Sequence, residues 1–143
     1  MLNIDIDNLI PHREKIKIVT GVHDIQDMSA VSSATVTSEW PLYDGQAADS
    51  LVLIEAIAQT AAIVEGYKRK QRGESGVKGW LVGIKNAEFY VDKIPVGTHL
   101  IILLESKYSF DNYGVVEGTV KSGEDILVTA TLQAMRLNDN DQQ

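Results

Sequence analysis

One carboxylate lies in an otherwise apolar stretch of the chain. Glu55 interrupts the run LVLIEAIAQTAAIV, and Gln59 follows it four residues later. Residues four apart share one face of a helix, so the two side chains are expected to be neighbours. A carboxylate in such surroundings must reach water, pair or stay protonated, and burial makes it a usable general acid or base near neutral pH. The spacing alone leaves two interpretations open, a catalytic Glu55 and a structural one that reaches out at a dimer seam or bonds backbone amides.

The three histidines offer one further candidate. His12, in the sequence Pro11-His12-Arg13, is either a turn residue or a partner for Glu55, whereas His23 and His99 are expected to be structural or exposed. No pair of histidines has the spacing of metal ligands, so we expect no metal site. The chain also has no phosphate loop, nucleophile elbow or dinucleotide fingerprint, and we expect no cofactor.

The loop before the apolar stretch supplies the other candidate residues. Residues 39–49 contain Asp44 and Gly45 and lead directly into Ser50 and Leu51. The start of a helix presents free amides and a positive dipole end, so the amides near Ser50 and Leu51 could hold a thioester carbonyl as an oxyanion hole. This property belongs to every helix start, and the pattern is weak by itself.

These candidates need a long helix and a sheet to position them. Residues 50–71 predict one helix, capped by Asp49 or Ser50 and ended by Gly73. Its first half is apolar on almost every side, which is typical of a helix that is buried all round. Alternating and β-branched residues predict strands over 16–22, 30–37, 80–84 with 87–91, 98–108, 115–121 and 126–135. Since nothing else can cover the helix, we expect an α+β fold in which a curled antiparallel sheet wraps it.

Length and charge limit the possible functions. The 143 residues carry a net charge of −7, which argues against nucleic acid or an anionic membrane as the partner. We expect one domain over residues 1–143, with 138–143 as a frayed tail. The basic run at residues 68–72 fits either a solvated helix end or a docking patch for an acidic carrier domain or a phosphate.

The cellular location is expected to be the cytoplasm. The chain has no cysteine, which excludes disulfides and a thiol nucleophile. The N-terminus carries acids where a secretory signal has basic residues. The longest apolar run is too short and too polar for a membrane span, which takes roughly 20 apolar residues, so we expect a soluble protein.

Five segments in order resemble one enzyme family. They read IPHREKIKIV, LVLIEAIAQTAAI, LVGIKNAEF, IPVGTHLIILLES and TLQAM, and they extend from Ile10 to Met135. Together they resemble the hotdog-fold 3-hydroxyacyl-acyl carrier protein dehydratases. The resemblance implies a hotdog fold, a homodimer or an oligomer of dimers, and an acyl substrate on a carrier-protein or coenzyme A thioester. It also implies loss of water to give a trans-2-enoyl thioester in fatty-acid or polyene-type lipid biosynthesis.

The resemblance also implies roles for particular residues. The helix carboxylate, here Glu55, would act on the leaving hydroxyl, with Gln59, Ser50, Leu51, Asp44 and Gly45 around the substrate. The family's loop histidine, which takes the proton next to the carbonyl, has no counterpart in the loop before the helix. The loop is more similar to that of an aryl polyene-type subgroup, and in this subgroup we expect His12 to supply the partner.

Two alternatives are kept beside the dehydratase. The first is a hotdog thioesterase in which Glu55 or Asp44 activates water. The second is a catalytically inactive hotdog that binds an acyl chain or pairs with an active relative, an interpretation suggested by the missing loop histidine.

Overall fold

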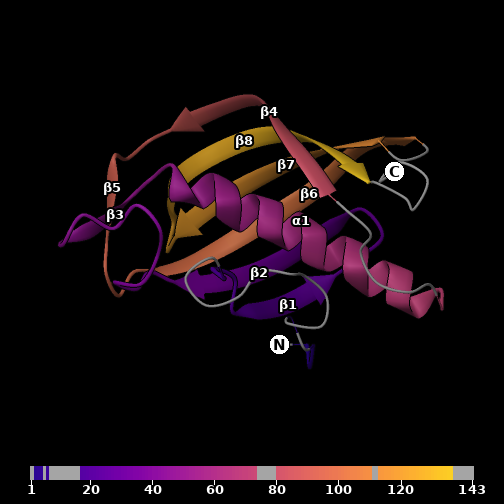
Figure 1. Cartoon of the computed structure of the whole chain (residues 1–143), viewed down its shortest axis with the longest axis horizontal. Coiled ribbons are helices and arrows are strands. Elements are labelled where there is room, and N and C mark those ends of the chain that lie inside the picture. The colour runs from indigo at the N-terminus through magenta and orange to yellow at the C-terminus, as the bar shows by residue number, and fades with distance from the viewer. Residues whose placement is uncertain (1, 5, 7–16, 74–79, 111–112, 137–143) are drawn as a thin grey trace, which may run out of the picture.

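A long helix lying across an antiparallel sheet forms the body of the molecule (Figure 1). The computed structural model describes residues 2–4, 6, 17–73, 80–110 and 113–136. Within these residues, the helix α1 (Val52–Gln71) packs on a six-stranded sheet of order β1-β2-β6-β7-β8-β4. Its strands are β1 (Gly21–Ile25), β2 (Ser29–Thr35), β4 (Trp80–Phe89), β6 (His99–Phe110), β7 (Tyr113–Ser122) and β8 (Asp125–Arg136). A short pair, β3 (Ala47–Asp49) and β5 (Lys93–Pro95), lies beside the start of α1.

The sheet forms because its strands alternate between apolar and polar residues. In β6 the side chains of Leu100, Ile102 and Leu104 are buried against the helix, and the intervening residues face outward. The same core cluster includes Leu53 and Ile57 of α1. The predicted α+β architecture, a long helix wrapped by a curled antiparallel sheet, is therefore confirmed.

Close packing fixes the N-terminal half of α1 on the sheet. Gly118 of β7 lies directly under Ile57, and a Cβ at Gly118 would come within 2.4 Å of Cγ2 of Ile57. A buried hydroxyl pair adds a second link. Thr60 donates to the Ala56 carbonyl at 2.8 Å, so the hydroxyl of Ser32 must be the donor in its 2.7 Å contact with Thr60. The helix therefore has one defined height and rotation above β2 and β7.

Some sequence predictions need correction. The first strand is Gly21–Ile25, so the predicted strand over residues 16–22 was placed too early. Residues 109 and 114 fall between two predicted strands, whereas Ser109 and Gly114 are paired across β6 and β7. Ile126, the first residue of the predicted strand 126–135, is exposed because the register of β7 and β8 shifts beside it. Gly73 has the expected positive φ, 78°, just after the helix.

Candidate active site

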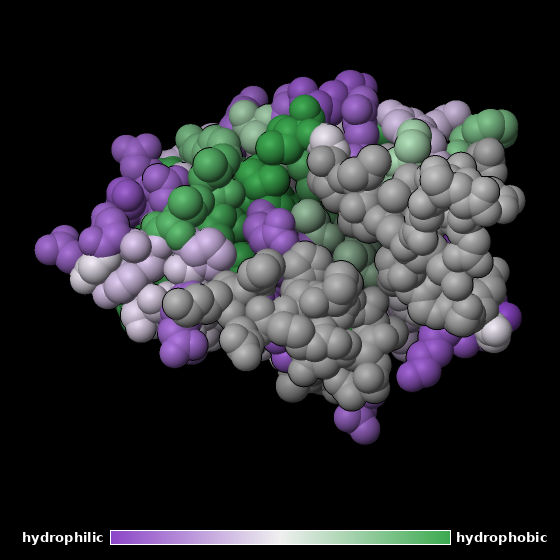
Figure 2. All heavy atoms as spheres, in the orientation of Figure 1, coloured by the Kyte–Doolittle hydropathy of each residue, from purple (hydrophilic) through white to green (hydrophobic). Residues whose placement is uncertain are grey.

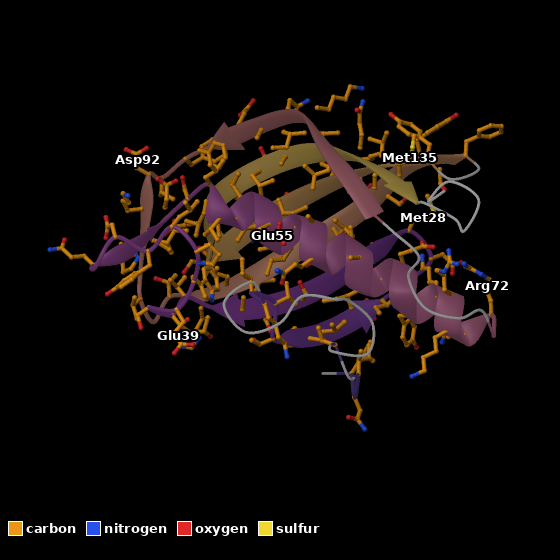
Figure 3. The ribbon with its side chains drawn as sticks, viewed as in Figure 1. Met28, Glu39, Glu55, Arg72, Asp92 and Met135 are labelled. Atoms are coloured by element: carbon orange, nitrogen blue, oxygen red, sulfur yellow. The ribbon has the colours of Figure 1, made fainter. Side chains whose placement is uncertain are left out.

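Glu55 projects from the first turn of α1 (Figure 3). Its carboxylate oxygen Oε1 accepts a hydrogen bond from the side-chain amide of Gln59 at 3.2 Å. The side chain of Glu55 is half-buried, whereas that of Gln59 is completely buried. The predicted contact between residues four apart on one helix face is therefore confirmed.

Gln59 connects Glu55 to a segment forty residues earlier in the chain. Its Oε1 accepts hydrogen bonds from the backbone amides of Ile18, at 2.8 Å, and Val19, at 3.1 Å. Two N–H donors at one atom identify that atom as the oxygen, so the NH2 group must point toward Glu55. The arrangement suits an amide that positions the carboxylate, since its oxygen is already occupied by the backbone.

The surface around Glu55 is apolar. Leu51, one turn before it, is 53% exposed, and Ala58, one turn after it, is half-buried. Figure 2 shows hydrophobic side chains gathered over the N-terminal half of α1 on this face. A partly exposed carboxylate in apolar surroundings can exchange a proton with a ligand that shields it from water, which is the arrangement that general acid–base chemistry requires. The helix was predicted to be buried on all sides, and this face is the exception.

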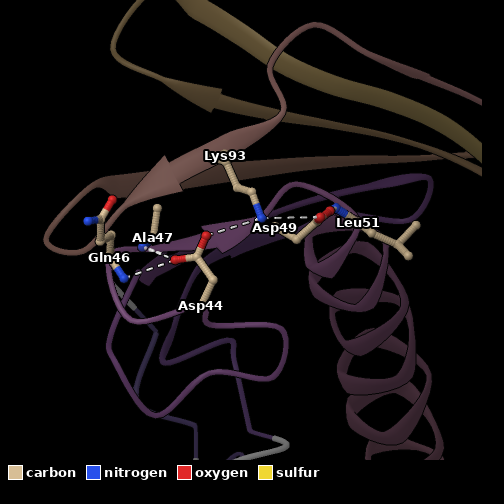
Figure 4. A network of polar contacts seen from close by, with 6 residues as sticks. All are labelled: Asp44, Gln46, Ala47, Asp49, Leu51 and Lys93. Atoms are coloured by element: carbon tan, nitrogen blue, oxygen red, sulfur yellow. Dashed lines mark hydrogen bonds and ion pairs between the residues drawn. The ribbon is translucent and has the colours of Figure 1, made fainter.

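Asp44 is held in a turn (Figure 4). Its Oδ1 accepts hydrogen bonds from the amides of Gln46, at 2.9 Å, and Ala47, at 3.0 Å, and Lys93 lies 3.3 Å from Oδ2. The amides of Ala47 and Gln46, together with the Lys93 ammonium, lower the pKa of Asp44 to about 2. A carboxylate of such low basicity is a poor base for activating water, so this contact weighs against the thioesterase mechanism through Asp44.

The amides at the helix start are already used. The amide of Ser50 donates to the carbonyl of Asp92 at 2.9 Å, and the amide of Leu51 donates to Oδ1 of Asp49 at 2.9 Å. The expectation that these two amides form an oxyanion hole is therefore corrected, because both have other acceptors in this structure. The predicted cap at Asp49 or Ser50 is also corrected, because the N-cap residue is Leu51 and no side chain caps the helix.

Lys93 is the residue at this end of the helix that sequence reasoning missed. Besides Asp44, its ammonium lies 3.6 Å from Oδ2 of Asp49, so one cation joins the loop to the helix start (Figure 4). Lys93 lies far from both acids in the sequence, and no local pattern predicts the pairing. Gly45, with φ of 102°, forms the tip of the same turn.

The predicted site residues that the structure describes form two groups along α1. Asp44, Gly45, Ser50 and Leu51 lie at the start of α1, and Glu55 with Gln59 lies one to two turns further along. The seventh candidate, His12, falls outside the described residues, as does the predicted tail 138–143.

The remaining histidines occupy exposed strand positions. His23 contacts the Ser33 hydroxyl at 2.9 Å, and His99 contacts the Thr35 hydroxyl at 3.0 Å. In the described ranges, no cluster of three or more His, Cys, Asp or Glu side chains could hold a metal ion. Among the helices that the structure describes, none has the length and apolar character needed to span a membrane.

Comparisons with known proteins point to one enzyme class. Residues 4–143 match the model of the ApeP-like family, described as ApeP dehydratase. The chain is 26% identical to the 3-hydroxyacyl-[acyl-carrier-protein] dehydratase FabZ of Alkaliphilus metalliredigens, over 96% of this chain and 95% of that protein. It is 29% identical to the FabZ of Thermoanaerobacter pseudethanolicus, over 92% and 94% of the two chains.

A solved structure shares the fold. The dehydratase heterocomplex ApeI:P from Xenorhabdus doucetiae contains a chain that superposes with a TM-score of 0.88 at 22% identity, covering 99% of this chain and 96% of that one. The similarity confirms the predicted hotdog fold.

Proposed function

The chain belongs to the ApeP-like dehydratase family, and from this premise we propose that it removes water from a 3-hydroxyacyl group held on a carrier thioester. The product would be the trans-2-enoyl thioester of fatty-acid or polyene-type lipid biosynthesis. The observation that carries the proposal is Glu55, a half-buried carboxylate on the apolar face of α1 whose orientation is set by Gln59.

Within the substrate, the reaction breaks the C2–H and C3–O bonds and forms a second bond between C2 and C3. A base removes the proton on C2, next to the thioester carbonyl, and the electron pair of that C–H bond becomes the C2–C3 π bond. The C3–O bond breaks at the same time or just afterwards, and an acid gives its proton to the departing hydroxyl, which leaves as water. Thioester and carrier are unchanged, and no oxidant or reductant is needed.

We assign to Glu55 the donation of a proton to the leaving hydroxyl. Its Oε1 is engaged by Gln59, and a carboxyl oxygen facing the apolar surface could donate a proton to a substrate hydroxyl there. Gln59 serves as the positioning residue, because its amide oxygen is bound to Ile18 and Val19 and cannot rotate without breaking both bonds. General acid–base groups of this kind contribute about 10²–10⁴-fold in rate.

We assign to His12 the removal of the proton on C2. His12 lies six positions before Ile18, whose amide is bound to Gln59, the partner of Glu55. Six residues span at most about 20 Å, so the chain length permits His12 to approach Glu55 of its own subunit. The loop before α1, which supplies the histidine in the related dehydratases, contains none here.

The carrier of the acyl group and the assembly of the subunits are also proposals. The FabZ relatives are named for acyl-carrier-protein substrates, which favours a carrier-bound acyl group over coenzyme A. The ApeI:P neighbour is a heterocomplex, so an assembly of this chain with a second hotdog subunit stands beside the homodimer. One domain over residues 1–143 and a cytoplasmic location stay predictions.

The experiment is a product analysis with purified protein. The chain is incubated with a 3-hydroxyacyl group on a carrier protein and, separately, on coenzyme A, and the products are identified by mass spectrometry. Loss of one water with the thioester intact supports the proposal, whereas release of free thiol supports the thioesterase.

Matched variants test the assigned roles. His12→Ala is compared with His23→Ala, which removes an exposed histidine that touches only the sheet surface. We expect His12→Ala to lose at least about 10²-fold in rate and His23→Ala to match the wild type. Equal rates in both variants would remove His12 from the mechanism, and binding of acyl carrier with no turnover by the wild-type chain would favour the inactive partner.

A further inference from the structure

A cavity lies under the C-terminal half of α1, away from Glu55. Its volume is about 340 Å³. In Figure 3, Met28 and Arg72, both of which line it, lie toward the C-terminal end of the helix. Its helix residues Ala61, Val64 and Lys68 lie roughly 9–20 Å along the axis from Glu55 and about 120–180° around it. The cavity is therefore separate from the face that carries the proposed catalytic carboxylate.

Small side chains create this cavity. In the N-terminal half of α1, the side chain of Ile57 occupies the space that a Cβ at Gly118 would need. Further along, the helix and the sheet present residues with little or no side chain beyond Cβ. These residues are Ser29, Ala61, Ser106, Ser109, Gly114 and Ala134. Among the described residues, the helix and the sheet therefore leave this space open toward the C-terminal end of α1.

The lining is apolar inside and charged at the rim. Val64, Leu104 and Val116 supply apolar surface, while Lys68 and Arg72 belong to the last turns of the helix. Cavities near 150 Å³ with apolar walls bind benzene, so this volume has room for a substituted ring or a chain of about eight carbons. Small-molecule sites typically combine a concave apolar lining with a few polar groups, as here.

Local charge at the rim is positive. Among the charged residues that line the cavity, Lys68 and Arg72 are basic, and Asp27 and Glu65 are acidic. Residues 68–72 hold four of the 13 Lys and Arg residues, so cations outnumber these two acids and an anion is attracted here, although the chain carries a net charge of −7. The rim is also held in place. The Lys68 ammonium donates to the carbonyl of Asp27 at 2.6 Å, and Arg72 lies 3.9 Å from Oε1 of Glu65.

Two apolar side chains remain exposed beside the opening. Met28 is 55% exposed and Tyr108 is 52% exposed, and both line the cavity. A ligand in the cavity would cover part of both side chains, which adds apolar contact that the empty cavity lacks.

We propose that this cavity binds an amphipathic carboxylate, a free medium-chain or arylalkanoic acid, with the chain between Ala61 and Val116 and the carboxylate beside Lys68 and Arg72. The site is distinct from the dehydratase site and does not depend on that reaction.

Octanoate, hexanoate and octanol are the probes, titrated by calorimetry into the whole protein. Each methylene removed from water strengthens binding by about fourfold, so octanoate should bind about 15-fold more tightly than hexanoate. Octanol should bind at least about fivefold more weakly than octanoate, because it lacks the charge. Absence of saturable octanoate binding, or equal affinity for octanol, would overturn the proposal.

Three variants locate the ligand. Arg72→Gln should weaken octanoate binding about fivefold, while Lys70→Gln, an equal change of charge on the same turns but outside the lining, should change it less than about twofold. Ala61→Leu should abolish binding by filling the cavity, with the unfolding midpoint unchanged or raised. Should Ala61→Leu fold poorly, Ser109→Phe fills the cavity from its exposed rim instead.

Competition kinetics distinguish this site from the proposed catalytic one. Octanoate should leave the KM for an enoyl thioester unchanged in the wild type and in Lys70→Gln. Wild-type affinity in Ala61→Leu and Ser109→Phe, or strict competition with the thioester, would contradict a separate site. A chain with no dehydratase activity would still bind octanoate, so failure of the proposed function and failure of this inference give different results.

Discussion

Replacing Gln59 by glutamate should make the stability of the protein depend on pH. In the wild type, the amide oxygen accepts from Ile18 and Val19 at 2.8 and 3.1 Å, and the amide nitrogen donates to Glu55 at 3.2 Å. The introduced carboxyl keeps the acceptor for both amides. Its second oxygen, however, faces another carboxyl at nearly the same distance, and it can donate only when it is protonated.

Two adjacent carboxyls in a buried position hold one proton between them, which raises the pKa of the introduced group. A rise of about 2 units is worth about 2.7 kcal/mol. In the unfolded chain the same group has a pKa of about 4.3. Because the folded pKa is raised, the stability of Gln59→Glu should be close to wild type below about pH 4 and should fall by about 2.7 kcal/mol as the pH rises to about 6.5.

Urea denaturation between pH 4 and pH 8 measures this difference. Gln59→Leu is the control, since it has no acceptor for the amides of Ile18 and Val19. Leaving two buried donors unsatisfied costs about 1–3 kcal/mol each, with little dependence on pH. A constant difference between Gln59→Glu and the wild type across this range would refute the reasoning, because it would mean that the introduced carboxyl does not face Glu55.

Three further predictions concern packing and the loop. Gly118→Ala should destabilise the protein by about 1–3 kcal/mol, because the added Cβ would collide with Ile57. Gly83→Ala is the control and should be neutral, since the nearest atom to its added Cβ is 3.8 Å away. Equal unfolding midpoints of the two variants in thermal melts would contradict this prediction. Asp44→Asn should lose less stability than the wild type when the pH falls from about 4 toward 2, because the low pKa of Asp44 stabilises the fold only above that range. The substitution should leave turnover unchanged. Thermal melts at stepped pH and an activity assay measure the two effects. Leu42→Gly should raise the unfolding midpoint or leave it unchanged, because Leu42 has φ of 64° and is exposed; a marked drop would show that its side chain is needed.

The long elements of the fold could be predicted because their residues repeat with one period. The apolar run with Glu55 and Gln59 predicts α1 to within two residues at its start, and the alternation in β6 predicts that strand. The first strand was misplaced for a physical reason. Ile18 and Val19 are β-branched and buried, yet their amides bind the side chain of Gln59, and the strand ladder starts at Gly21.

The site could be predicted only where its contacts are local. The pairing of Glu55 with Gln59 follows from helix geometry, and the Asp44 turn is typical of an Asp-Gly sequence. The carbonyl of Asp92, which accepts from Ser50, and the cation of Lys93 come from β5 and the residue before it, more than forty residues further along the chain. Such contacts depend on tertiary packing, so a motif in one segment carries no information about them.

The central claim is that Glu55 performs acid–base chemistry on a 3-hydroxyacyl thioester, and the most direct test is a rate measurement on Glu55→Gln. The variant keeps the shape of the side chain and an acceptor for Gln59. Glu117→Gln, at an exposed position of β7, is the matched control. Hydration of a trans-2-enoyl thioester is followed by the loss of enoyl absorbance. We predict a loss of at least about 10²-fold in Glu55→Gln and wild-type rates in Glu117→Gln. Full activity of Glu55→Gln on a substrate that the wild type turns over would contradict the account.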